Sequence, residues 1–271
     1  MNYDIVANAE HLKVFYNVFR EYICANVSHN RSHIVWHLQA RKKYNPTPQQ
    51  SRSTVMLARQ HMCLESDAET FLRRVQSLEI KRGLYVDRAA QNTAEEAVAI
   101  ANESLVLYAT VNALDRVAAT QKLVSNVVDK FLLSSPSDAQ KFPFIDKDFI
   151  TQLHNSPCTK VQFLDVDTCD QDFLIKLDAF LIDNGALVFL VTKTKNGYHY
   201  VIYRGPVMRF LTTFCAENAK DMHGNDQISM CNNGLLAVPG TFQGGVPVEL
   251  LYAAGSSMYR QYASGRKPPC Y

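Results

Sequence analysis

The fold of this chain is built around the stretch Val161-Gln162-Phe163-Leu164-Asp165-Val166-Asp167, an apolar run that ends in two acids. Side chains at i and i+2 of a strand point to the same face, so Asp165 and Asp167 should lie together at a strand end. Paired carboxylates there offer hard oxygen ligands for a divalent cation. Further along, Thr194-Lys195-Asn196-Gly197-Tyr198-His199 predicts a positively charged hairpin. Together the two stretches indicate metal-assisted chemistry on a nucleotide.

Composition limits the class of protein. The chain has 271 residues, is 47% hydrophobic and 20% charged, and carries a net charge of +2. These values are ordinary for a globular protein, and so small a net charge does not itself indicate nucleic-acid binding. Seven dispersed cysteines without a C-x-x-C pair predict reduced thiols in an intracellular, reducing compartment. No apolar stretch approaches the ~20 residues needed to span a bilayer, so we expect no membrane partner.

The first part of the chain is expected to be helical. Apolar residues recur with helical spacing within residues 1–40, and a second helical stretch is expected over 51–80. The segment 41–50 contains two prolines among polar residues and is expected to be a loop. The expected division is a helical N-terminal region, a catalytic domain and a C-terminal tail, at residues 1–70, 71–258 and 259–271.

Three histidines in the N-terminal region, His29, His33 and His37, recur every four residues and would share one face of a helix. Two neighbours at i and i+4 could share a zinc ion. The outer two would lie about 12 Å apart along the helix axis, and no fourth ligand is indicated. A solvent-facing row of histidines is therefore favoured over a metal site.

The rest of the chain alternates strands and helices. The expected elements are a helix near 93–102, a strand at 105–111, a helix at 115–132, a strand at 160–167, a helix at 171–183, strands at 186–193 and 198–204, a helix at 206–217, and strands at 227–231, 234–238 and 247–252. The order strand–helix–hairpin–helix–strand fits a split βαβ layout, in which helices pack on one side of a mostly antiparallel sheet.

Each candidate motif also has an alternative interpretation. Asp-x-Asp is short, and Asp167 or Thr168 could simply cap the helix that follows. A lone histidine such as His199 is more often a hydrogen-bonded structural residue than a catalytic one. The neighbouring Lys193 and Lys195 favour a functional role, because three donors could converge on a triphosphate.

The ordered motifs resemble the archaeo-eukaryotic primase (primase-polymerase) superfamily. The resemblance rests on an acid-x-acid strand, a hairpin ending in x-His, a further acid, and the turn Val238-Pro239-Gly240-Thr241. The stretch Leu107-Tyr108-Ala109-Thr110-Val111-Asn112, followed by Arg116 and a helix, is similar to the segment that opens many members. Lys81-Arg82-Gly83-Leu84-Tyr85-Val86 is similar to the element that precedes it. The resemblance covers roughly residues 70–255, and the ordered set carries it rather than any single motif.

The resemblance implies an α+β fold with a primase-polymerase-like catalytic core, a split βαβ or RRM-like sheet with packed helices. It implies a metal-dependent nucleotidyltransferase that adds nucleotides to a 3′-hydroxyl on a nucleic-acid template, with Mg²⁺ or Mn²⁺ in a two-metal site. The expected partners are nucleoside triphosphates, a DNA or RNA template, and a helicase or other replication protein.

The expected site residues follow in three groups. The catalytic and metal-binding acids are Asp165, Asp167 and Asp226. The nucleotide-binding residues are His199, Lys193, Lys195, Gly197 and Thr241. Arg41, Lys42 and Lys43 form a basic cluster that is expected to contact template phosphates.

Two departures from the family pattern favour a second hypothesis. Gly197 stands where serine is usual, and Ala237 stands where many relatives carry arginine. A catalytically weakened, nucleic-acid-binding replication accessory protein of the same fold would tolerate both changes. A third hypothesis is a metal-dependent enzyme acting on a nucleotide-sugar or a phosphodiester, because Asp-x-Asp also serves glycosyltransferases. The histidine hairpin and the Pro-Gly-Thr turn give that hypothesis no support.

Overall fold

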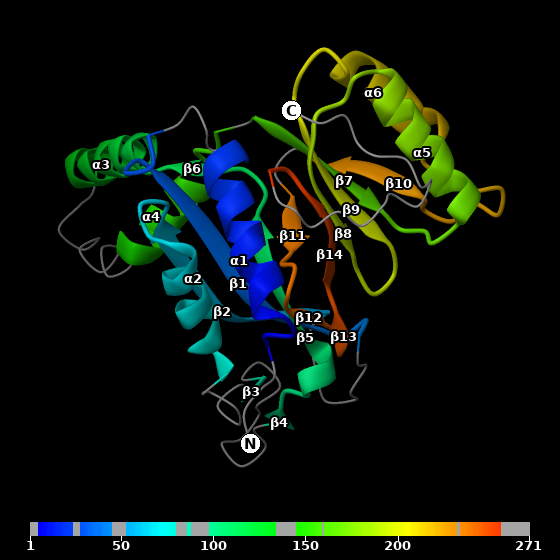
Figure 1. The fold of residues 1–271 in the computed structure, drawn as a ribbon. Coiled ribbons are helices and arrows are strands. Elements are labelled where there is room, and N and C mark those ends of the chain that lie inside the picture. The colour runs from blue at the N-terminus through cyan, green and yellow to red at the C-terminus, as the bar shows by residue number, and fades with distance from the viewer. Residues whose placement is uncertain are drawn as a thin grey trace.

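Two large antiparallel sheets, flanked by six α-helices, make up the described part of the chain (Figure 1). The computed structural model describes residues 5–23, 28–44, 53–79, 86–87, 98–133, 145–158, 160–231 and 234–255. The expected α+β class is confirmed. Among the described residues, the free cysteines are Cys63, Cys158, Cys169, Cys215 and Cys231. Within the described ranges, every helix is too short or too polar to cross a membrane.

The first sheet has seven strands in the order β13-β12-β5-β1-β2, with β11 also paired to β5 and β6 to β1. Its strands are β1 (Ser32–Arg41), β2 (Thr54–Cys63), β5 (Leu105–Thr110), β6 (Leu114–Asp115), β11 (Leu235–Ala237), β12 (Phe242–Gln243) and β13 (Val246–Pro247). Alternate residues of β1 on one face pack against α1 (Ala9–Val18), its π-helical extension Phe19–Ile23, and α2 (Ala68–Gln76). The other face meets α3 (Arg116–Leu133) and α4 (Ile145–His154).

The second sheet has five strands in the order β10-β7-β9-β8-β14. Its strands are β7 (Val161–Val166), β8 (Val188–Lys193), β9 (Tyr198–Tyr203), β10 (Ile228–Cys231) and β14 (Glu249–Ala253). Two helices, α5 (Gln171–Asp183) and α6 (Met208–Glu217), pack on one face through Leu164 and Val166 of β7 (Figure 1). The opposite face, through Val161 and Phe163, joins the core formed by α1 and the first sheet.

The helices expected over 1–40 and 51–80 are wrong for residues 32–41 and 54–63, which form β1 and β2. Ile34, Trp36, Leu38 and Ala40 of β1 recur at every second position and all join the core around α1 and α2, which is a strand period, although β1 is buried on both faces. Positions four apart share a face in a strand as well as in a helix, so the histidine spacing did not distinguish the two. Only α1 with its extension, and α2, are helical in these ranges.

His33 and His37 therefore do not lie on a wet helix face. Both belong to β1 and are buried, with 5% and 3% exposure. The helix expected near 93–102 is also wrong where it can be compared, since β4 (Val98–Ala99) and a 3-10 turn (Asn102–Ser104) stand there. Residues 93–97, most of the loop at 41–50 and the tail at 259–271 lie outside the described residues.

The elements expected from residue 105 onward are confirmed, with α5 at its expected bounds. The cap of α5 is informative for the site. Its N-cap is Asp170, whose carboxylate accepts the N–H of Asp172 at 3.1 Å. The alternative interpretation of Asp167 or Thr168 as the cap of this helix is therefore wrong, and the carboxylate of Asp167 is not used as a helix cap. At the other end, Gly185 (φ 62°) follows the helix as the Asn184-Gly185 signal predicts.

Candidate functional site

The central feature of the site is a carboxylate–imidazole pair across two neighbouring strands. The register of β7 and β9 places Asp165 directly opposite His199. The Nε2 atom of His199 lies 3.3 Å from Oδ1 of Asp165. His199 is 6% exposed, and its ring meets Phe163 edge-on with centroids 5.0 Å apart. The sheet core thus fixes the imidazole while one nitrogen faces the acid.

Gly197 lets the hairpin that carries His199 approach β7. A β-carbon at this position would lie 1.9 Å from the carbonyl oxygen of Val166 and 3.2 Å from Cα of Asp167. The turn is closed by Thr194, whose N–H and hydroxyl both donate to the carbonyl oxygen of Gly197, at 2.8 Å and 3.1 Å. Glycine is therefore a packing requirement at this position.

The acids open onto a cavity of about 90 Å³ that is lined by both sheets. Its lining residues are Arg41, Lys43, Tyr44, Tyr108, Asp165, Asp167, Thr194, Asn196, His199, Leu235 and Gln243. The first sheet supplies the two cations, and the second sheet supplies the acids and the histidine. The cavity has the size of a few water molecules, so it suits ions or a phosphate group rather than a whole nucleotide.

The cationic wall is held by a hydrogen-bonded pair of tyrosines. Arg41 Nη1 donates to the hydroxyl of Tyr108 at 2.8 Å, and the hydroxyls of Tyr44 and Tyr108 are 3.3 Å apart. Gln243 Nε2 donates to the Tyr44 hydroxyl at 2.7 Å. Burial and the neighbouring Tyr108 raise the pKa of Tyr44, so its hydroxyl is neutral. These contacts orient Arg41, and the Lys43 ammonium lies 5.1 Å from the ring centroid of Tyr44.

The two acids of Asp-x-Asp have pKa values that diverge. Burial would raise the pKa of Asp165, but the hydrogen bond and charge of His199, with Lys43 and Arg41, hold it below its ordinary value. Partial desolvation and then the negative charge of Asp165 raise the pKa of Asp167. The carboxylates are thus close enough to repel each other, which a bound cation would relieve.

Asp226 lies near this pair but points elsewhere. It precedes β10, which neighbours β7, and the N–H of Asp167 donates to the carbonyl of Gln227 at 3.0 Å. The Asp226 carboxylate is 77% exposed and forms an ion pair with Lys220. Its charge still contributes to the raised pKa of Asp167. Within the described residues, no three His, Cys, Asp or Glu side chains are arranged to hold a metal ion. Asp165 and Asp167 fit a divalent cation as a pair of oxygen donors, and Asp226 would join them only after leaving Lys220.

Several other expected residues lie away from the cavity. Lys193 is paired with Tyr198 rather than His199, so it projects toward the helical face of the sheet. Thr241 is fully buried, and its hydroxyl donates to the carbonyl of Val238 at 2.7 Å. Lys195 is tethered to the glycine-rich turn, its N–H to Gln243 Oε1 at 2.9 Å and its Nζ to the Gly244 carbonyl at 3.0 Å. Of the basic cluster, Arg41 and Lys43 line the cavity, whereas Lys42 does not.

Sequence reasoning missed the wall that faces the acids. Tyr44, Tyr108 and Gln243 come from three distant segments, and each sits among residues that predict a loop or a buried strand. Only the basic residues at 41–43 are recognisable from the local sequence, which shows that they are charged but not where they lie relative to the acids. The meeting of Arg41 with Asp165 depends on how the two sheets pack, which has no local sequence signature.

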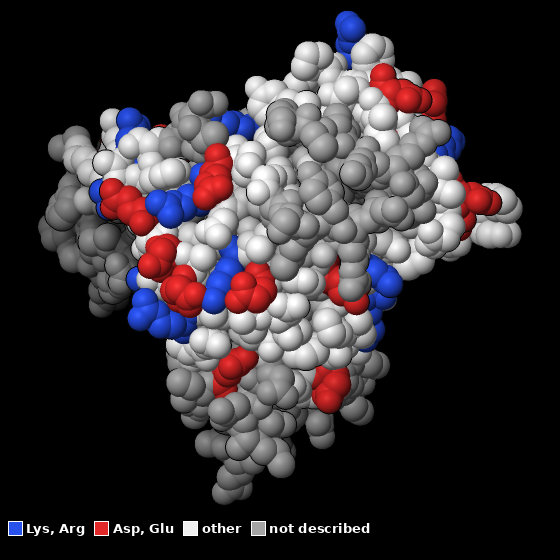
Figure 2. Space-filling model, in the orientation of Figure 1, with Lys and Arg blue, Asp and Glu red and all other residues white. Residues whose placement is uncertain are grey.

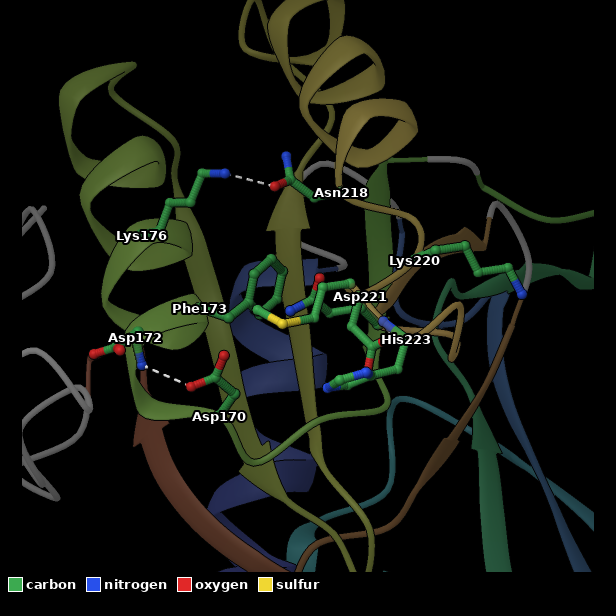
Figure 3. Close-up of a pocket in the computed structure, with 10 residues that line it drawn as sticks. Asp170, Asp172, Phe173, Lys176, Asn218, Lys220, Asp221 and His223 are labelled. Atoms are coloured by element: carbon green, nitrogen blue, oxygen red, sulfur yellow. Dashed lines mark hydrogen bonds between the residues drawn. The ribbon is translucent and has the colours of Figure 1, made fainter.

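A second, larger pocket of about 420 Å³ lies between the start of α5 and the loop after α6 (Figure 3). Two of its three acids are already engaged. Asp170 caps α5, and Asp221 accepts the N–H groups of His223 and Asn225 at 2.8 Å each. Lys176 donates to Asn218 at 2.6 Å. Because these polar groups satisfy one another, the smaller cavity at Asp165 is the stronger candidate for chemistry.

Comparisons of the chain with protein-family models, with curated proteins and with solved structures find no match. The face that carries α1 and α2 mixes charges of both signs, as Figure 2 shows, and Lys13 there pairs with Glu10 and Glu69. The described part of that face therefore lacks the single-sign basic patch that a nucleic-acid footprint requires.

Proposed function

We propose that this protein is a metal-dependent nucleotidyltransferase of the primase-polymerase type, which adds nucleotides to a 3′-hydroxyl on a nucleic-acid template. One observation carries the proposal. Asp165 and His199 face each other at 3.3 Å on adjacent strands, beside Asp167 and across a cavity from Arg41 and Lys43. Acids that attract a divalent cation and cations that attract phosphate thus meet in one place.

The arrangement of the second sheet supports the proposal. The element order β7-α5-β8-β9-α6-β10 and the strand order β10-β7-β9-β8 are those of a split βαβ, RRM-like unit. The acids and the histidine lie on β7 and β9, the two strands in the middle of this unit. This order supports the primase-polymerase-like core that the resemblance implies, in which the acid-x-acid and x-His motifs would lie on neighbouring strands.

Asp165 and Asp167 are the residues that would hold Mg²⁺ or Mn²⁺, with Asp226 as the third acid after it exchanges Lys220 for the metal. Such ions lower the pKa of the attacking 3′-hydroxyl and neutralise charge on the phosphates. This protein's own contribution is electrostatic. Arg41 and Lys43 offset phosphate charge from the opposite wall, and Nε2 of His199 donates a hydrogen bond to a phosphate oxygen.

The small cavity sets a limit on what is bound inside it. A phosphate group fits there, while the rest of the nucleotide would lie at its mouth, where template contacts would begin. Arg41 and Lys43 are therefore assigned to the nucleotide, and of the basic cluster Lys42 is left for template phosphates. A helicase or other replication protein remains the expected macromolecular partner.

Nucleotide incorporation on a primed template with Mn²⁺ tests the proposal. The wild-type protein should extend the primer, and the double variant Asp165→Asn, Asp167→Asn should not, because amides keep the shape but lose the charge. Asp172→Asn, an exposed acid in the first turn of α5, is the matched control and should extend normally. Extension by the double variant at the wild-type rate would refute the assignment.

A second candidate function is the non-catalytic accessory protein. The observation that favours it is Ala237, which is fully buried beside Val106 and Tyr108, so the arginine of many relatives has no room at this position. Template binding by the wild-type protein without any incorporation, with either Mg²⁺ or Mn²⁺, would support this candidate over the enzyme.

A further inference from the structure

Two buried polar atoms, one on a residue that lines the site and one on its strand neighbour, have no hydrogen-bond partner among the described residues. They are Nδ1 of His199 and Oγ1 of Thr192. Thr192 is fully buried and His199 is 6% exposed. Buried polar groups in folded proteins are almost always paired, and an unpaired one is costly. Two unpaired atoms in one place therefore call for an explanation.

The two residues are direct neighbours. Thr192 on β8 and His199 on β9 are opposite each other in the register, so their side chains project from the same face. On the other side of His199 stands Asp165 on β7, also opposite it in register. The three side chains form one row across three strands, with the imidazole in the middle.

The hydrogen-bonding capacities in this row are complementary. An ionised carboxylate only accepts, so Asp165 favours the tautomer in which the His199 nitrogen that faces it carries the hydrogen, and a donor at the other nitrogen would add to that preference. In a neutral imidazole the other nitrogen, Nδ1, is then a bare acceptor. A threonine hydroxyl can donate to it. A rotation about χ1 of Thr192, or one bridging water, would join the two unpaired atoms.

We propose that Thr192 is a positioning residue, whose hydroxyl donates to Nδ1 of His199 and so keeps the hydrogen on Nε2. Nε2–H then points at Asp165 in the free protein and is ready to donate to a phosphate oxygen. The part that concerns phosphate rests on the proposed function, whereas the part that concerns the tautomer does not. Without the hydroxyl, the hydrogen would also populate Nδ1, and a bare Nε2 would face the carboxylate.

The test replaces Thr192 by valine, which has the same shape without the hydroxyl, and by serine, which keeps it. Nitrogen-15 NMR of the imidazole distinguishes a hydrogen-bearing nitrogen from a bare one. Wild type and Thr192→Ser should show His199 almost wholly as the Nε2–H tautomer. Thr192→Val should raise the Nδ1–H fraction at least several-fold. Thr212→Val is the control, because that hydroxyl is on α6 and donates to Met208.

Thermal unfolding gives an independent readout. If the hydroxyl donates to His199, Thr192→Val should lower the melting temperature, whereas loss of an unpaired buried hydroxyl should leave it unchanged or raise it. An unchanged tautomer together with an unchanged or raised melting temperature in Thr192→Val would overturn the proposal.

Nucleotide incorporation separates this inference from the proposed function. A tautomer change in Thr192→Val with no incorporation by the wild type would uphold Thr192 and reject the enzyme. Incorporation by the wild type, together with an unchanged tautomer in Thr192→Val, would support the enzyme and reject the role of Thr192. If both hold, Thr192→Val should raise KM for the nucleotide several-fold, and Thr192→Ser should restore it.

Discussion

Gly197 and Val166 approach so closely that a β-carbon on residue 197 would lie 1.9 Å from the Val166 carbonyl oxygen. The residue preceding Tyr198 and His199 must therefore lack a side chain if the hairpin is to lie against the acid-x-acid strand. The contact is with backbone, which cannot swing away as a flexible side chain would. This relationship connects the geometry of the turn with the distance between His199 and Asp165.

A serine at position 197 should consequently harm this protein. Gly197→Ser is expected to lower the free energy of unfolding by about 1–3 kcal/mol, because the hairpin must shift away from β7. Nucleotide incorporation should fall with it, since His199 moves with the hairpin. Urea unfolding and primer extension measure the two effects. A serine variant as stable as wild type, and more active, would show that the hydroxyl matters more than the contact.

The turn at Gly240 is expected to serve stability, since it docks α1. The N–H groups of Ala7 and Asn8 both donate to its carbonyl, and a β-carbon there would lie 2.3 Å from the Asn8 carbonyl oxygen. Gly240→Ala should destabilise the protein by several kcal/mol, through both the clash and the positive φ of 81°.

Gly224→Ala is the matched control for this substitution. Gly224 has a nearly identical φ of 82° but open space around its Cα. It should therefore lose only the backbone term of about 1–2 kcal/mol. Equal losses in the two alanine variants, measured by urea unfolding, would argue against a docking role for the turn.

Acid should destabilise the packing of β1 against β2 and α4. Burial lowers the pKa of His33 to about 4, with a further contribution from the charges of His61 and Arg116. Burial likewise lowers the pKa of His37 to about 4, with a further contribution from the charges of His154 and Arg59. His33 Nδ1 lies 3.2 Å from His61 Nδ1, and Arg59 Nε donates to His37 Nδ1 at 3.3 Å. Protonation of His33 would place a buried positive charge beside His61, and protonation of His37 would place one beside Arg59.

The sign of the pH effect follows from the lowered pKa values. The unfolded chain takes up protons near the ordinary histidine pKa of 6.5, whereas the folded chain resists until about 4. Stability should thus be full above pH 6.5 and decline as pH falls toward 4, by on the order of 2–3 kcal/mol for each histidine. Urea unfolding at a series of pH values measures it. The double variant His33→Gln, His37→Gln should flatten the decline, and the exposed His223→Gln should not.

The divergence between the two acids of the site gives a further prediction. The charge of Asp165 helps to raise the pKa of Asp167, so Asp165→Asn should lower the pKa of Asp167 toward its ordinary value. Desolvation is the larger cause, and part of the elevation should remain. Carbon-13 NMR of the side-chain carboxyl follows the titration. An Asp167 pKa that stays the same or rises in the variant would place the two carboxylates too far apart to share a cation.

The helices and strands are predictable from the sequence in some parts of the chain and not in others. From Leu105 onward, strands and helices alternate with clear turn signals such as Asn196-Gly197, and local rules predict the elements there except α4 and the short strands β6, β12 and β13. In β1 the alternation of Ile34, Trp36, Leu38 and Ala40 indicates a strand, but the helical spacing of the apolar residues at 12–23 favours a helix that continues through it. Tertiary pairing with β2 and β5 decided the outcome.

The site shows the same division. The i, i+2 spacing of Asp165 and Asp167 gave their common position, because strand period is a local property. The partner of His199 depends on the register of β7 and β9, and the approach of Arg41 depends on the packing of two sheets. Thr241 was misplaced because a Pro-Gly turn looks the same whether it binds a ligand or, as here, docks a helix.

The most direct test of the central claim is a crystal structure of the protein with Mn²⁺ and a non-hydrolysable nucleoside triphosphate. The account predicts an anomalous manganese peak about 2.1 Å from carboxylate oxygens of both Asp165 and Asp167, with the phosphate tail between His199 and Arg41. Manganese bound only elsewhere, for example at the loop of Asp221, or a nucleotide bound away from His199, would contradict it.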